Sequence, residues 1–565
     1  MQIFFIYPFP PPELQPTCFG QGIGYVSAVL KREGHKTRGI IIHRLEREKI
    51  EEELSRFRPD LIAISTTYDQ FPLTKEICSF LAEIEAPPVV IGGIHATTCP
   101  EECLALENVI GVCRGEGEEA MAEFVSHLEK KEDYLGTKNF WFRHQGKTIK
   151  NPLRPLIKDL NALPFPDREL IDFQRLVDTQ REAQFMAGRG CPYFCTYCVN
   201  HYLIKEYKGL GSFVRLRDVE NLIAEIEKVV ARYPGIERIG FDDDIFIMNR
   251  SWLSQFAEEY PKRVGLPFWC NARVNLVDKE IVALLKKAGC FQVKMGVESG
   301  NSRIRNDILK RRIKDEEIIR AFELVRGAGI ECWSFNMIGL PYETEETILD
   351  TIRLNRRIKP DRICLSMFQP YPETESYYLA KREGWISGER VSSYFEDKPT
   401  LSLPTIDGET ITDYFHIFRE MVEKGEEGYF LSYGWHSWEE EGGTRFRWSK
   451  KEAEILVKSR KKPEAFSLTI SAHFPDLATR PLTVSFTVDG EEKVRLTLNN
   501  DAPKRVTIPL PEKTGRFIRI RMHLSHAIVP ARDLGIPDPR EIGVKARDFE
   551  LTLAKKGFLT RLLSD

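Results

Sequence analysis

The sequence lacks the features that would place it in a membrane or on nucleic acid. In its 565 residues no uninterrupted apolar run approaches the roughly 20 residues that span a bilayer. Its charge is almost balanced, with 81 basic and 84 acidic side chains and a net charge of −3, which gives no support for a nucleic-acid partner. The first residues form a short apolar run ended by prolines, without a basic leader or cleavage site. These absences predict no transmembrane segment and a cytoplasmic location.

A secretory disulfide framework is also missing, because the 12 cysteines are scattered along the chain, which fits a reducing compartment. Three of them, Cys191, Cys195 and Cys198, nevertheless form a C-x3-C-x2-C run directly after an Arg-Gly turn. Closely spaced thiolates let one loop hold one iron–sulfur cluster, and three ligands leave one iron of a four-iron cluster open to a small molecule.

Other interpretations of the three thiols fit the loop less well. Zinc normally takes four ligands, and no second Cys or His pair follows before Cys270. Three buried cysteines, or a disulfide with one spare thiol, would suit an apolar core segment. The loop instead contains Gly, Pro and polar residues, so a cluster is the interpretation that we prefer.

The segment resembles the cluster loop of the radical S-adenosylmethionine enzymes, including the aromatic residue Tyr197 between the second and third thiols. The resemblance implies a 4Fe–4S cluster held by the three thiols, with the amino and carboxylate groups of S-adenosylmethionine on the open iron. It also implies that reduction of the cluster cleaves the sulfonium and yields a 5′-deoxyadenosyl radical. The electrons would come from an external donor such as flavodoxin or ferredoxin.

Residues 1–150 alternate short apolar runs with helical patterns. Strands are expected at 3–7, 36–42, 61–65, 88–92 and 109–113, and helices at 22–33 and 73–84. This alternation predicts a parallel, Rossmann-like sheet covered by helices on both faces. Ligands of such sheets bind beyond the carboxyl ends of the strands. The candidate contacts in the turns there are Thr66, Thr67, Tyr68, Gly92, Gly93, His95, Gly115, Glu116 and Gly117.

These turns resemble those of the cobalamin-binding-type domain that precedes many radical S-adenosylmethionine domains. The resemblance covers Met1 to about Lys150 and implies that cobalamin rests on the turn residues. The Asp-x-His-x-x-Gly element that supplies an axial histidine in many cobalamin proteins is absent from the loop after the first strand. We therefore expect no cobalt-ligating histidine from that loop, and we interpret His95 as a turn residue. A module that no longer binds cobalamin is the alternative.

Residues 151–180 are rich in proline and are expected to form a linker. Residues 181–385 repeat strand–helix units, which predicts a partial (β/α)6 barrel with its active site at the carboxyl ends of the strands. The resemblance places Asp243, from an acidic turn, at the amino group of S-adenosylmethionine, and Glu298 at its ribose hydroxyls. Lys310, or another residue of its basic run, would meet the ligand carboxylate, and Gly339 would let the backbone approach adenine.

Each of these assignments has an alternative interpretation in which the residues bind no ligand. The acidic turn and the basic run could be solvated surface, and Glu298 could be an acid near the start of a helix. Arg273, at a strand end, is a further candidate for a cofactor or substrate contact. The sequence names no catalytic residue beyond the cofactor contacts.

The last part of the chain has a different pattern of apolar and polar residues. Residues 386–430 are expected to be a helical connector, and residues 431–565 contain short alternating segments that predict an antiparallel β-sandwich. Sequence around Trp435 and Trp448 resembles a β-sandwich domain often attached to glycan-processing proteins. Those tryptophans could stack on sugars or fill the sandwich core.

The fold class is thus α/β, with a cobalamin-binding-type domain, a partial radical barrel and a β-sandwich. The resemblance implies a cobalamin-dependent radical S-adenosylmethionine enzyme that methylates an unactivated carbon. Cyclisation, rearrangement or oxidation without methyl transfer is the alternative, and an iron–sulfur redox sensor is a third possibility from another class. The substrate is expected to be a small molecule, a lipid or a saccharide-linked compound.

Overall fold

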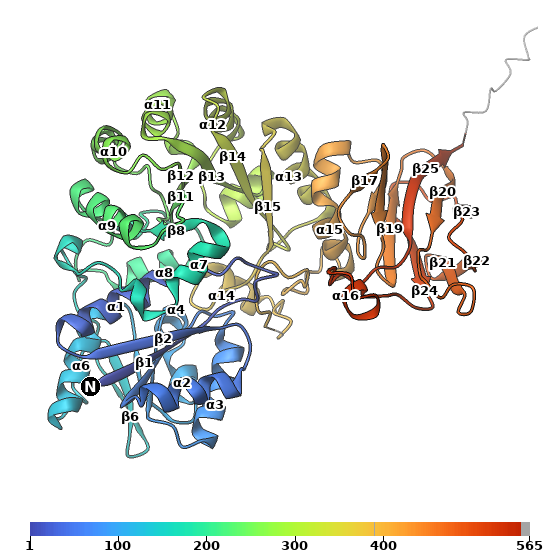
Figure 1. The fold of residues 1–565 in the computed structure, drawn as a ribbon. Helices are drawn as coiled ribbons and strands as arrows, with labels where there is room; N and C mark the ends of the chain where they lie inside the picture. The colour runs from blue at the N-terminus through green and yellow to red at the C-terminus, as the bar shows by residue number, and fades with distance from the viewer. Residues whose placement is uncertain (389, 555–565) are drawn as a thin grey trace, which may run out of the picture. The chain divides into compact units, whose positions relative to one another are not determined.

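The computed structural model describes residues 1–388 and 390–554, and the chain divides into two compact units, Met1–Ile411 and Thr412–Asp565. Figure 1 shows the fold of each unit. In the described ranges, no helix is long and apolar enough to cross a membrane. The end of the predicted sandwich, residues 555–565, lies outside the described residues. The limits predicted for the individual domains stay predictions.

The first sheet has seven strands in the order β2-β1-β3-β4-β5-β6-β7. The first five are parallel, and β6 and β7 add an antiparallel hairpin. The strands are β1 (Gln2–Pro8), β2 (Lys36–Ile42), β3 (Leu61–Ser65), β4 (Val89–Gly92), β5 (Val109–Cys113), β6 (Phe140–His144) and β7 (Lys147–Lys150).

Helices cover both faces of this sheet (Figure 1). Because side chains alternate along a strand, Phe4 and Phe5 of β1 belong to separate hydrophobic cores. Phe4 shares its core with the helices α2 (Arg47–Phe57) and α3 (Phe71–Glu83). Phe5 shares its core with α1 (Gln21–Arg32) and α6 (Glu118–Lys130). This confirms the predicted Rossmann-like architecture.

The second large sheet has six parallel strands in the order β15-β14-β13-β12-β11-β8. The edge strands β8 and β15 are not paired with each other in the described residues, so the barrel is open, as predicted. The strands are β8 (Glu182–Phe185), β11 (Arg238–Phe241), β12 (Phe268–Ala272), β13 (Cys290–Glu298), β14 (Glu331–Ile338) and β15 (Arg362–Met367).

One hydrophobic core fills the space between these strands and the helices around them (Figure 1). The helices that contribute buried side chains include α9 (Val219–Arg232), α10 (Arg250–Arg263), α11 (Lys279–Ala288) and α12 (Asp315–Gly327). This packing fixes the strand ends, and with them the loops that carry the candidate site.

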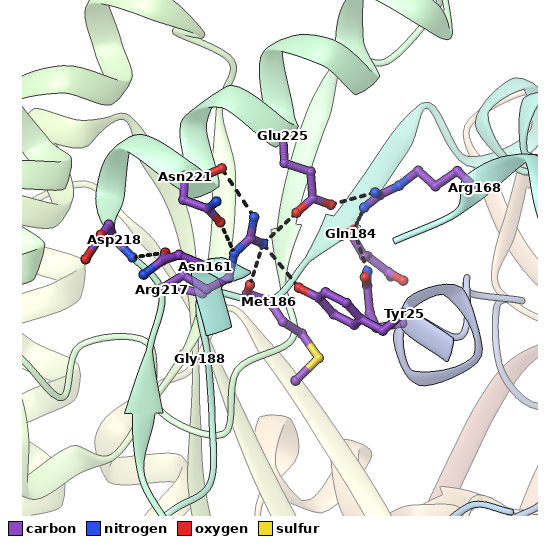
Figure 2. Close-up of polar contacts among 12 residues, drawn as sticks. Tyr25, Asn161, Arg168, Gln184, Met186, Gly188, Arg217, Asp218, Asn221 and Glu225 are labelled. Carbon is purple, nitrogen blue, oxygen red and sulfur yellow. Dashed lines mark hydrogen bonds and ion pairs between the residues drawn. The ribbon is translucent and has the colours of Figure 1, made fainter. Parts of the chain in front are cut away.

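A buried ionic cluster ties the first unit together, as Figure 2 shows. Glu225 of α9 pairs with Arg168 at 2.6 Å and with Arg217 at 2.5 Å, and all three side chains are at most 3% exposed. Arg217 also reaches the hydroxyl of Tyr25 in α1 at 3.4 Å. Arg168 donates to the backbone oxygen of Gln184 in β8 at 2.7 Å. Residues from the first sheet's helices, the predicted linker and the barrel therefore share one network.

The second unit is a β-sandwich of two five-stranded sheets, in the orders β16-β19-β24-β21-β22 and β17-β18-β25-β20-β23. Neighbouring strands run antiparallel. The strands are β16 (Gly428–Leu431), β17 (Glu439–Glu441), β18 (Thr444–Trp448), β19 (Glu452–Lys458), β20 (Pro463–Ser471), β21 (Leu482–Val488), β22 (Glu491–Leu498), β23 (Lys504–Pro509), β24 (Ile518–Leu524) and β25 (Lys545–Leu553).

Trp435 contributes to packing in this sandwich. Its ring lies against the hydrophobic core, and its indole N–H donates to the backbone oxygen of Glu454 at 2.8 Å. Trp448 contacts Phe446 and His473 edge to face. Both tryptophans thus have partners inside the unit, and sugar binding by this domain stays a prediction.

Candidate active site

The three thiols of the predicted cluster loop lie between β8 and helix α8 (Val199–Glu206). Cys195 is buried, and Cys191 and Cys198 are half-buried. Burial, with a contribution from the neighbouring thiols, raises the pKa of Cys198 to about 12 and that of Cys191 to about 11. Thiolates at these positions need nearby positive charge, which bound iron supplies. The donor set therefore fits a cluster.

Asp243 holds the start of this loop. Its carboxylate oxygens accept the backbone N–H of Ala187 at 2.8 Å and that of Gly188 at 2.6 Å. Burial raises the pKa of Asp243 to about 7, while the two N–H groups favour the anion. The carboxylate that we predicted at the amino group of the ligand is thus engaged with the loop backbone, and its ligand contact stays a prediction.

Glu298, Tyr197 and Arg311 form a buried polar cluster. One nitrogen of Arg311 donates to the Tyr197 hydroxyl at 2.6 Å and to the Glu298 carboxylate at 2.8 Å. Glu298 ends β13 with a φ of 66°, where the pairing with β14 shifts register. Burial raises the pKa of Glu298, and the charge of Arg311 opposes that shift. The Tyr197 hydroxyl also donates to the Glu298 carboxylate at 3.3 Å, so these two predicted site residues meet directly and share Arg311 as a partner.

Lys310 has a different partner. Its ammonium group pairs with Glu375 at 2.5 Å, and its side chain is 49% exposed. Arg311, its neighbour in the predicted basic run, is the residue that reaches Glu298. The choice of Lys310 for the ligand carboxylate stays a prediction.

Arg273 lies beside the second thiol. Its guanidinium group is 3.7 Å from the Cys195 sulfur, donates to the backbone oxygen of Arg311 at 2.5 Å, and lies 3.8 Å from the centre of the Tyr193 ring. The side chain is buried. A buried cation therefore contacts a predicted cluster ligand.

Two cavities lie where the strands of the first sheet end. One, of about 500 Å³, has walls from the turns of the first sheet and from the thiol loop, through Tyr197 and Cys198. The other, of about 410 Å³, follows the glycine-rich turns. Eight of the nine predicted turn residues line these two cavities: Thr67, Tyr68, His95, Gly92, Gly93, Gly115, Glu116 and Gly117. Thr66 is buried instead and bonds to Thr74 at 2.8 Å.

Glycines of two turns line the smaller cavity and pack tightly against neighbouring residues. Gly93 has a φ of 93°, and a Cβ there would lie 2.6 Å from the backbone oxygen of Thr66. A Cβ on Gly115 would lie 1.7 Å from the Tyr207 hydroxyl. Only glycine fits such positions. The backbone path of these turns therefore depends on glycine, and the turns line the cavity that we predict to hold cobalamin.

Glu116 and His95 have structural partners. The Glu116 carboxylate pairs with Arg189 at 2.9 Å and with Arg215 at 2.8 Å, so it ties the first sheet to the thiol loop. His95 is buried against Phe71, with ring centroids 4.2 Å apart. Burial lowers the pKa of His95, so its imidazole is neutral. The structure places His95 in the short helix α4 (Ile94–Thr98) rather than in a turn, and its role at the cofactor stays a prediction.

Comparison with protein families supplies the deciding observation. The family model of the radical SAM superfamily matches residues 186–354. The family model of the B12 binding domain matches residues 14–125. The first match contains the three thiols, and the second contains the glycine-rich turns. The chain belongs to the cobalamin-binding radical S-adenosylmethionine enzymes.

Two relatives illustrate the range of the family. An uncharacterized methyltransferase of Pyrococcus horikoshii is 27% identical to the enzyme over 404 residues, which cover 69% of this chain and 84% of the relative. The anaerobic magnesium-protoporphyrin IX monomethyl ester cyclase of Rubrivivax gelatinosus is 25% identical over 375 residues. That match covers 63% of this chain and 65% of the cyclase. The chain thus spans less than two thirds of the length of the cyclase.

Solved structures share the fold of the enzyme. The radical S-adenosylmethionine methyltransferase TsrM from Kitasatospora setae superposes with a TM-score of 0.56 at 17% identity, over 68% of this chain and 77% of TsrM. The cobalamin-dependent S-adenosylmethionine radical enzyme OxsB superposes with a TM-score of 0.54 at 18% identity, over 75% of this chain and 63% of OxsB. The enzyme accordingly uses a 4Fe–4S cluster, S-adenosylmethionine and cobalamin.

Arg273 gives a first testable prediction. We expect Arg273→Met to lower the midpoint potential of the cluster, because a cation and an N–H group beside a ligand sulfur stabilise the reduced cluster. The measurement is an anaerobic redox titration followed by electron paramagnetic resonance, at matched iron content. Arg250→Met removes an exposed arginine of α10 and should leave the potential unchanged. Equal potentials in wild type and Arg273→Met would contradict the prediction.

Glu343 gives a second prediction, on pH dependence. It is buried and accepts the N–H of Gly339 at 2.5 Å and that of Leu340 at 3.1 Å, and burial raises its pKa from 4.5 to about 8. The folded state therefore keeps a proton that the unfolded state loses. The contribution of Glu343 to the free energy of unfolding is complete below pH 4.5. It falls as the pH rises toward 8, by at most about 1.4 kcal/mol per pH unit.

Glu343→Gln should remove this dependence, because a glutamine stays neutral. We expect the melting temperature of the wild type to fall relative to that of Glu343→Gln between pH 5 and pH 8, as measured by thermal unfolding. Glu346→Gln changes an exposed glutamate of the next helix and serves as the control. If the melting temperatures of Glu343→Gln and wild type change in parallel between pH 5 and pH 8, Glu343 is ionised in the folded chain.

Proposed function

We propose that the enzyme is a C-methyltransferase that acts on an unactivated carbon. S-adenosylmethionine, the cluster and cobalamin, when bound, supply the 5′-deoxyadenosyl radical and the methyl group. The observation that carries the proposal is the cavity of about 500 Å³, which has Tyr68 and His95 from the first sheet on one wall. Tyr197 and Cys198 from the thiol loop form another wall. A substrate there would contact both cofactor modules at once.

Residues of the chain have distinct roles in this proposal. Cys191, Cys195 and Cys198 hold the cluster. Tyr197 and Glu298, joined by Arg311, contact S-adenosylmethionine, with Asp243, Lys310 and Gly339 as the further predicted contacts. The turn residues that line the two cavities hold cobalamin.

The walls of the larger cavity also suit radical chemistry. Tyr7, Phe9, Tyr68, Tyr371 and Tyr394 line it, so aromatic side chains surround the space. Such walls exclude water and keep a reactive intermediate from side reactions. They also fix the substrate in one orientation, which makes the transfer effectively unimolecular.

The partners follow from the same chemistry. The enzyme would take electrons from an external flavodoxin or ferredoxin and would act on a small-molecule, lipid or saccharide-linked substrate, in the cytoplasm. The methyltransferase name of the Pyrococcus horikoshii relative supports methyl transfer. The cyclase name of the Rubrivivax gelatinosus relative supports radical cyclisation as a second candidate.

Anaerobic incubation of the reconstituted enzyme separates these functions. The reaction contains reductant, cobalamin, an extract of small metabolites from the producing cells, and S-adenosylmethionine with a trideuterated methyl group. We expect 5′-deoxyadenosine and S-adenosylhomocysteine to form together, along with a metabolite that carries the labelled methyl group. 5′-Deoxyadenosine without S-adenosylhomocysteine would support cyclisation or rearrangement. Neither product from cluster-loaded enzyme would overturn the proposal, and Cys195→Ala enzyme is the blank.

A further inference from the structure

One acidic side chain stands out in the larger cavity. Asp69, in the loop after β3, is the single carboxylate among the described residues that line the cavity, and no lysine or arginine lines it. His95 also lines it but is neutral, as burial lowers its pKa. An ionised Asp69 therefore faces this space without a cation on the cavity wall.

Two residues of the barrel side hold Asp69 in place. The Tyr371 hydroxyl donates to one carboxylate oxygen at 3.1 Å. The Gln369 amide nitrogen, when it faces the carboxylate, donates to the other oxygen at 2.5 Å, while the amide oxygen accepts the Tyr394 N–H at 3.2 Å. A carboxylate has about four acceptor sites on its two oxygens. These two bonds fix the orientation of Asp69 and leave acceptor capacity for a ligand.

The surroundings of Asp69 are aromatic. Tyr68 packs edge to face against His95 and against Tyr371, with ring centroids 5.7 Å apart in both pairs. Asp69 itself is 8% exposed, and burial raises its pKa to about 7, with the Tyr371 hydrogen bond acting in the opposite direction. A hydrogen bond to a charged acceptor in such a place is among the stronger ones in proteins.

We propose that Asp69 binds a hydrogen-bond-donating group, an amine or a hydroxyl, on a substrate that is otherwise apolar and carries a ring. Asp69 is thus a specificity-determining residue, and the proposal rests on the proposed function, which places the substrate in this cavity. The aromatic walls accept the apolar body by shape and area, whereas the carboxylate rejects analogues that lack the donor. Asp69 takes no part in the radical step.

A donor at Asp69 could also come from the amide groups around the edge of cobalamin. The two sources are separated by using enzyme loaded with cluster and cobalamin, in which the cofactor's own donors are already in place. Probe binding to this enzyme then reports on acceptor capacity that remains for the substrate.

The experiment compares indole, whose N–H donates, with benzofuran, which has the same shape and no donor. Dissociation constants are measured anaerobically at pH 8 by isothermal titration calorimetry. We expect the wild type to bind indole about 10-fold more tightly than benzofuran, the effect of one hydrogen bond to a charged group. In Asp69→Leu that preference should fall to about 1, with benzofuran affinity retained.

Asp69→Asn keeps the shape of the side chain and tests the proposal if the leucine variant fails to fold. It should reduce the preference to a few-fold, because its amide oxygen is a neutral acceptor. A wild type without preference for indole would overturn the proposal. So would an unchanged preference in both variants, or a variant that loses retained corrin absorbance while the preference persists. These binding data involve no turnover, so they fail or succeed independently of the methylation test.

Discussion

Cys195→Ala enzyme is expected to lose its cluster and, with it, all reductive cleavage of S-adenosylmethionine. Cys195 is the most buried of the three thiols and receives the Arg273 contact. Three thiols bind three of the four irons and leave one open. A loop with two thiols leaves two irons without a protein ligand and should hold no stable four-iron cluster. Loss of a residue that hydrogen-bonds to a metal ligand typically lowers metal affinity or activity roughly 10- to 100-fold. Loss of a ligand itself should lower them further.

The measurements are iron and sulfide content after anaerobic reconstitution, and 5′-deoxyadenosine formed with reductant. Cys78→Ala provides the matched control, because Cys78 is an equally buried free thiol in α3 of the first sheet's domain. That variant should load iron and cleave S-adenosylmethionine like the wild type. A Cys195→Ala enzyme that retains full iron content and cleavage would remove Cys195 from the proposed ligand set.

Glu225→Gln is expected to destabilise the first unit by about 3–5 kcal/mol, because it leaves two buried guanidinium groups without their counter-charge. Arg168 and Arg217 both depend on this one carboxylate (Figure 2). Glutamine has nearly the same shape, so the loss reports charge rather than packing. The measurement is the free energy of unfolding from urea denaturation of the full chain, followed by circular dichroism.

Glu227→Gln is the matched control for that experiment. Glu227 lies on the same helix, α9, two positions further on, and pairs with Arg263 at 2.5 Å at the surface. Exposed pairs contribute about 0–1 kcal/mol, so this variant should unfold close to the wild type. Equal stability of the two variants would mean that water or another group compensates the buried arginines.

Hydrophobic periodicity predicted the strands that position the site, because strands buried on both faces appear as short apolar runs. Strand β3 (Leu61–Ser65) and strand β5 (Val109–Cys113) keep the predicted limits 61–65 and 109–113. Helix α2 (Arg47–Phe57) was missed, because only Ile50 and Leu54 of its residues are buried and the rest of it is polar. The β6–β7 hairpin was missed as well.

Pairings at the site depend on backbone geometry that residue spacing does not encode. Lys310, Arg311 and Arg312 are adjacent, yet only Arg311 reaches Glu298. A π-helical turn at Ile304–Ile308, followed by positive φ angles at Lys310 and Arg312, separates the directions of the three side chains. Asp69 and Tyr371 are distant in sequence and meet only in the folded unit, so no sequence pattern indicated this pairing.

The ionic cluster around Glu225 has a consequence for how such a chain can be divided. The match to the B12 binding domain ends at residue 125, and the match to the radical SAM superfamily begins at residue 186. These limits suggest dividing the chain between them to produce the two domains separately. Any such cut separates Tyr25 from Arg217 and Glu225, and a cut after Arg168 separates that residue from them as well. A fragment carrying only the barrel would leave these buried polar groups without some of their partners. The corrin-binding and radical-generating modules should therefore be grafted, swapped and evolved as a single block.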